Sequence, residues 1–294
     1  MSRPRIEPFI AAVFALVLSL ACSSTLPHAR GLASAGAAYG KATDALLQVS
    51  QETAVDADSS RLLSEAQGLT REERRALLEK HAAVSQTVAD LERLRRHARL
   101  LTRYFEALGR LAQDDADAQA ADATGSAAAA LNRLGSELTG STLLTAAERG
   151  LLSQTARLST GAVRRGAIGR ELSARAGAID QEIRIQQTML DAVRRKLRAD
   201  LESSSSLGRE RDVARPFIEN AVADPRGWIA LRRGYLLVPA DTDALKSASD
   251  AASKLRAAWN AFAAGTFNEA ARAGLMADIE SVVAYAEAVR VMQR

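Results

Sequence analysis

The sequence contains few of the residues that build disulfide-linked or β-sheet folds. It has one cysteine, so no disulfide bond can form within the chain. Aromatic residues make up only 4% of the sequence, and there are six prolines, none of them between His28 and Arg215. Sandwiches and barrels depend on aromatic and β-branched residues and on many turns. The composition therefore predicts an all-α fold.

Neither strong charge nor low hydrophobicity is present. Hydrophobic residues make up 47% of the sequence, which excludes a disordered chain. The length of 294 residues is enough for one large or two small domains. The formal net charge is only +4. Such an even balance does not indicate nucleic acid as a partner.

The first 21 residues are typical of an export signal. Arg3 and Arg5 precede a short apolar segment, residues 9–18. This segment is shorter than the roughly 20 apolar residues that a membrane-spanning helix needs. We expect residues 1–21 to act as a signal peptide.

The segment Ser19-Leu20-Ala21-Cys22 resembles the lipobox of bacterial lipoproteins, although Ser19 stands where leucine is commonest. The resemblance implies acylation of Cys22, by palmitate among other chains, and cleavage before it. Ser23, in place of the aspartate of retained lipoproteins, implies sorting to the periplasmic face of the outer membrane in a Gram-negative cell. Residues 22–34 have the composition of a loop and predict a lipid-anchored tether ahead of a helical domain at 35–294.

Two segments of the mature chain place apolar residues in alternating steps of three and four. The positions are Leu91, Leu94, Ala98, Leu101, Phe105, Leu108 and Ala112 in one segment, and Leu172, Ala176, Ile179, Ile183, Gln186, Leu190, Val193 and Leu197 in the other. On a helix this spacing makes one stripe that packs against another helix. We expect an elongated antiparallel bundle with coiled-coil-like heptad packing.

Local signals predict where helices start and stop. Thr70 and Thr145 are each followed three residues later by glutamate, the pattern of a capping box. A helix is expected over 71–112, followed by an acidic loop or frayed segment at 113–125. The serine-rich segment 203–208 predicts a hinge and a sub-boundary within the bundle.

The sequence lacks the motifs of catalysis and metal binding. There is no glycine-rich phosphate loop, no GxSxG elbow and no cysteine besides Cys22. His81 and His97 have no second ligand three or four residues further on, so we expect them at solvent-facing positions or beside the apolar stripe. We expect no enzyme activity, no cofactor and no metal.

Arginines crowd one part of the predicted helix at 71–112, with Arg95 and Arg99 at its centre. Two interpretations fit them. They bind an acidic partner or anionic lipid head groups, or they form a solvated face paired with neighbouring carboxylates.

Aromatic residues gather between Pro216 and Pro239, where Phe217, Trp228 and Tyr235 lie. These side chains suit the anchoring of a protein partner, and they equally suit a plug at the end of the bundle.

Together these patterns predict a non-catalytic envelope lipoprotein that serves as a helical scaffold or adaptor for a protein partner. The alternative is a periplasmic chaperone or small-ligand carrier that uses a groove between helices. Homo-oligomers stay possible, because heptad stripes pair equally well within and between chains.

Overall fold

The computed structural model describes residues 25–113, 118–141, 143–152, 166–219, 222–237 and 240–292. These residues form helices and connecting turns without a β-strand, which confirms the all-α prediction for the described part of the chain. The helices are α2 (Thr25–Glu65), α3 (Arg71–Lys80), α4 (Ala83–Leu111), α5 (Ala118–Thr139), α6 (Ala146–Leu152), α7 (Ala167–Arg209), the π-helix η1 (Glu210–Ala214), α8 (Arg215–Glu219), α9 (Pro225–Leu237), α10 (Ala240–Ala264) and α11 (Glu269–Met292).

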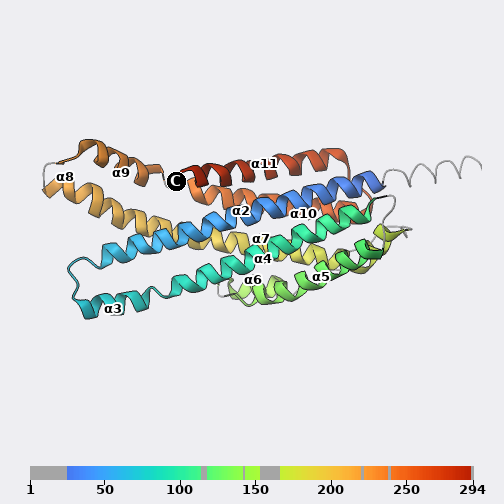
Figure 1. Cartoon of the computed structure of the whole chain (residues 1–294), viewed down its shortest axis with the longest axis horizontal. Coiled ribbons are helices and arrows are strands. Elements are labelled where there is room, and N and C mark those ends of the chain that lie inside the picture. Colours follow the sequence, from blue (N-terminus) through green and yellow to red (C-terminus); the bar gives the residue numbers. More distant parts are fainter. Residues whose placement is uncertain are drawn as a thin grey trace, which may run out of the picture.

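The long helices lie side by side in an elongated bundle (Figure 1). Helix α4 runs antiparallel to α2, with which it makes an extensive contact, and α5 runs antiparallel to α4. Helix α7 runs in the same direction as α2, and α10 and α11 form an antiparallel pair that packs on both. The expected elongated bundle is therefore present.

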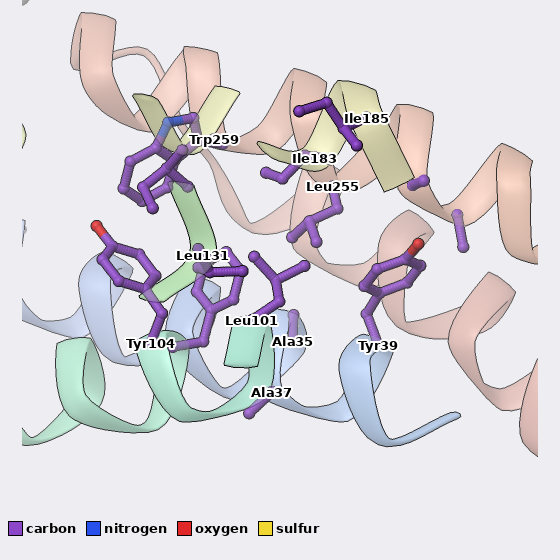
Figure 2. Close-up of a cluster of buried hydrophobic side chains, with 14 of the residues drawn as sticks. Ala35, Ala37, Tyr39, Leu101, Tyr104, Leu131, Ile183, Ile185, Leu255 and Trp259 are labelled. Atoms are coloured by element: carbon purple, nitrogen blue, oxygen red, sulfur yellow. The ribbon is translucent and has the colours of Figure 1, made fainter. Parts of the chain in front are cut away.

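Both predicted apolar stripes are buried. Every stripe position of α4 and α7, together with Ala112 just after α4, has at most 3% of its surface exposed. At the centre, Trp259 of α10 contacts the rings of Tyr104 and Phe105 edge-on, with centroids 6.0 Å apart in each pair (Figure 2). The heptad spacing therefore predicted correctly which side chains are buried. Knobs-into-holes packing of these side chains stays a prediction.

Both predicted capping boxes are present. The Thr70 side chain accepts a hydrogen bond from the Glu73 backbone N–H, and Glu73 accepts one from the Thr70 backbone N–H. Thr145 and Glu148 make the same reciprocal pair at the start of α6. These pairs satisfy N–H groups that have no partner within the helix.

The helix expected over 71–112 is broken in two. Helix α3 ends at Lys80, and α4 begins at Ala83. No residue of α3 is buried, so no packing holds this segment in line with α4. Between them His81 turns inward, and its Nδ1 lies 2.9 Å from Asp58 Oδ1 of α2.

The expected tether over 22–34 is wrong for residues 25–34, which form the first turns of α2. Ala29 and Leu32 are fully buried, because this end of α2 packs against the end of α4 and the turn between α10 and α11. Arg30 Nε donates a hydrogen bond to the Ala112 carbonyl at 2.9 Å. Packing overrides the loop-like local composition.

Two breaks in the helices do not lie where the sequence predicts them. Residues 118–125, expected to loop or fray, belong to α5, where Thr124 is fully buried and donates to the Ala120 carbonyl. Helix α7 continues through the expected hinge at 203–208, and the helical geometry changes only at η1. Serine and alanine are tolerated in helices, so composition alone misplaced both boundaries.

Candidate partner-docking site at the distal end

The bundle has two dissimilar ends. At the end that we call proximal, the start of α2 lies beside the end of α4 and the α10–α11 turn. At the opposite, distal end lie the α2–α3 turn, the end of α7, and α8 (Figure 1). Arg215 at the start of α8 donates to the Gln67 side chain at 3.3 Å, which joins two of these distal segments. Cys22 lies outside the described residues, and the described chain begins three residues later at the proximal end.

We call η1, α8 and α9 the distal arm, residues 210–219 and 222–237. Phe217 stacks on Trp228 with the ring centroids 5.6 Å apart. The Trp228 indole N–H donates to the Val213 carbonyl at 3.1 Å, and the Arg232 guanidinium lies over the same ring. The structure thus brings two of the three predicted aromatic residues together. Tyr235 belongs to α9, but its side chain is outside what the structure describes.

The distal arm carries large apolar side chains on its surface. Phe217 is 65% exposed and Ile218 is 76% exposed, and Ile229 and Leu231 of α9 are also exposed. Seven of the ten exposed large hydrophobic residues in the described chain lie at the distal end: Leu63, Leu78, Leu207, Phe217, Ile218, Ile229 and Leu231. Scattered surface leucines need no explanation, but a concentration of this kind is typical of an interaction surface.

Arg95 and Arg99 lie in the α2–α4 interface, well apart from the distal arm in sequence. Arg95 Nε and Arg99 Nη1 contact the same Asp44 oxygen at 3.0 and 2.9 Å, and Arg99 Nη2 contacts Glu92 at 2.8 Å. Burial acts to raise the pKa of Glu92, but Arg99 and Arg95 outweigh it and lower this pKa. Of the two interpretations, the contacts favour paired charges that hold α2 to α4.

His81 and His97 are buried, so the solvent-facing alternative is wrong, whereas His97 lies beside the apolar stripe next to Ala98, as the other alternative predicted. His97 is fully buried, and its Nε2 lies 3.0 Å from Glu182 Oε2, which links α4 to α7. His81 is also buried beside Asp58 of α2. Local spacing could not reveal these pairs, because each partner lies on a helix distant in sequence.

A cavity of about 320 Å³ lies where α2, the start of α4 and α7 meet. Its ionisable lining residues are Asp58, Arg61, Glu65, Lys80, His81, Lys196 and Asp200. Most of these charges are already paired with one another, such as Arg61 with Asp58 at 2.8 Å and Lys196 with Asp200 at 2.5 Å. Burial acts to raise the pKa of Asp58, but hydrogen bonds from Arg61 and His81 outweigh it and lower this pKa.

The described residues contain no cluster of three or more His, Cys, Asp or Glu side chains placed to hold a metal ion. None of the described helices combines the length and apolar character needed to cross a bilayer.

Sequence reasoning missed the apolar residues Ile218, Ile229 and Leu231. The available signal was the composition of α9, which has three arginines among apolar residues and no carboxylate. Comparison of the chain with protein-family models, with curated proteins and with solved structures found no match.

Proposed function

We propose that the protein is a non-catalytic envelope lipoprotein that acts as a scaffold or adaptor. Acylated Cys22 would hold it on the periplasmic face of the outer membrane, and the distal arm would bind a protein partner. The observation that carries this proposal is the gathering of exposed apolar side chains at the end of the bundle opposite the start of α2.

The length of the bundle sets the distance between the lipid anchor and a partner on the distal arm. Helix α2 has 41 residues and a length of about 60 Å at 1.5 Å per residue. Three residues of chain span at most roughly 11 Å, so a lipid on Cys22 would keep the proximal end close to the membrane. A partner on the distal arm would therefore sit several tens of ångströms from the lipid.

Buried charged groups support a structural role, because they join helices. Asp180 of α7 is fully buried and accepts two hydrogen bonds from Arg256 of α10. The Tyr104 hydroxyl of α4 donates to Glu171 of α7 at 3.0 Å. Such pairs fix the register of one helix on another, as a rigid scaffold requires.

The test is photo-crosslinking in cells from Ile218, which lies on the distal arm. The exposed Leu151 of α6 serves as the control position, and a Cys22→Ser variant removes the anchor. We expect one dominant envelope protein that crosslinks from position 218, is absent at 151, and decreases strongly without the anchor. Absence of a partner at 218 would refute the scaffold, and many unrelated clients would identify a chaperone instead.

The cavity beside His81 favours a second candidate, a carrier of a small ligand. Its volume of about 320 Å³ is at the lower end of typical ligand sites. If the protein is such a carrier, a periplasmic small-molecule extract should raise the melting temperature of the parent protein. The Arg61→Ala variant should show no such increase. An unchanged melting temperature would remove this candidate.

A further inference from the structure

Helix α9 carries three arginines and no acidic residue, whereas the helices of other exposed arginines, such as α3 and α4, also carry carboxylates. Arg226, Arg232 and Arg233 are exposed, and no carboxylate among the described residues forms an ion pair with any of them. By contrast, Arg95 and Arg99 in the α2–α4 interface both contact carboxylates. Helix α9 itself contains no acidic residue. Three positive charges of this helix are therefore left uncompensated.

Three of the four carboxylates of the distal arm already have partners. Asp224 precedes the helix and accepts hydrogen bonds from the backbone N–H groups of Arg226 and Gly227, both at 3.1 Å. Asp212 of η1 accepts two hydrogen bonds from Arg211. In α8, Glu219 lies 3.8 Å from the guanidinium of Arg215. Glu210, the fourth carboxylate of the arm, is exposed and forms no ion pair with these arginines in the described part of the chain, so they can attract an external anion.

These arginines surround one exposed apolar side chain. Ile229 has Arg226 three positions before it and Arg232 and Arg233 three and four positions after it. Residues three and four apart are neighbours on a helix surface. Ile229 is 51% exposed, so the surface of α9 presents an apolar centre within a positive rim.

We propose that the distal arm binds an acidic protein segment, in which an apolar side chain contacts Ile229 and neighbouring Asp or Glu residues pair with the three arginines. This inference rests on the proposed scaffold function and names the chemistry of its partner. Arginine and tryptophan are the residues that most often dominate binding energy at protein interfaces. Bidentate pairing of guanidinium with carboxylate adds geometric specificity.

The same observations favour a protein over a lipid surface. A helix that lies in a membrane interface separates its cationic face from its apolar face. In α9 the two are mixed, because Ile229 lies among the arginines and the Arg232 guanidinium lies over the Trp228 ring. A partner must therefore supply apolar and acidic groups side by side, which a protein surface does.

The first experiment reverses the charges. The variant R226E/R232E/R233E should reduce the yield of the partner crosslinked from position 218 at least tenfold, with unchanged helical circular dichroism. The control R71E/R75E/R103E makes the same change at exposed arginines outside the arm and should leave the yield unchanged. A yield retained by the arm variant would overturn this inference and leave the scaffold intact. No crosslink in the parent protein would instead refute the scaffold.

The second experiment keeps the charge and reports the contact directly. The variant R226K/R232K/R233K introduces amines that a carbodiimide couples only to carboxylates in contact with them. We expect links between these lysines and Asp or Glu of the same partner, and none from α9 of the parent, which has no lysine there. Absence of such links would overturn the proposal. The proposal would also be overturned if the parent protein bound vesicles with 30% anionic phospholipid and R226E/R232E/R233E did not. In that case the arginines of the arm would bind a membrane and not a protein.

Discussion

Gly36 of α2 tests the close approach of α2 to α4. A Cβ atom added there would lie 2.6 Å from Phe105 Cδ1 and nearer still to two other ring carbons. Favourable contacts between carbon atoms lie at about 3.5–4.0 Å, so the ring or the helix would have to move by roughly 1 Å. Phe105 is fully buried between Tyr104 and Trp259, which leaves the ring no free direction.

The expected magnitude follows from two opposing effects. Overpacking a core costs about 1–3 kcal/mol, and this buried ring places Gly36→Ala near the upper limit. Replacing glycine by alanine within a helix contributes about 1 kcal/mol in the opposite direction. We expect a net loss of about 2 kcal/mol in the free energy of unfolding. For a chain of 294 residues, with an unfolding entropy of about 2.1 cal/mol/K per residue, this loss lowers the melting temperature by about 3–4 °C.

Urea denaturation followed by circular dichroism measures this loss. The matched control is Gly274→Ala in α11, where an added Cβ meets no atom within 4 Å and should stabilise by up to about 1 kcal/mol. Phe105→Leu frees space beside Gly36, so the double variant should lose less than the sum of the two single variants. The packing argument would be refuted if the losses of stability in the two single variants added up exactly in the double variant. It would also be refuted if Gly36→Ala were as stable as the parent.

Three further predictions concern buried or capping polar groups. Since the pKa of Asp58 is lowered by folding, its contribution to stability is present above about pH 4 and is lost as the pH falls through the folded pKa. Asp58→Asn should therefore make the free energy of unfolding depend less steeply on pH below about pH 4, and an unchanged slope would contradict this. His97→Leu should cost about 3–5 kcal/mol in urea denaturation because it leaves buried Glu182 without its partner, whereas His97→Leu with Glu182→Leu should cost less. Thr145→Ala should cost about 1 kcal/mol at the start of α6, measured as local hydrogen-exchange protection, and Thr145→Ser should retain it.

Much of the fold could be predicted from local patterns. The steps of three and four fixed which face of α4 and of α7 is buried, because a helix repeats every 3.6 residues. Threonine followed by glutamate located the starts of α3 and α6, because that cap is made within one helical turn. The segments 25–34 and 118–125 were assigned wrongly, because their composition is polar or acidic but their alanines and leucines find partners in space.

The candidate site was predictable only in part. Aromatic residues among prolines predicted a partner-binding segment that contains Phe217 and Trp228; the structure shows these two rings stacked, and the binding role stays a prediction. The arginine-rich part of α4 left two interpretations open in the sequence, because Asp44, which pairs with Arg95 and Arg99, lies some fifty residues earlier.

The sequence by itself determined that the chain is helical, which faces are apolar and where two helices begin, since these properties depend on residues within a few turns of one another. Tertiary structure alone decided which charges are paired between helices. His97 meets Glu182, and Arg256 meets Asp180, across 85 and 76 residues, and no local pattern carries that information. It also decided that the arginines of α9 form no ion pair with a carboxylate among the described residues, because their arm lies at the end of the bundle and most of its carboxylates bind other groups.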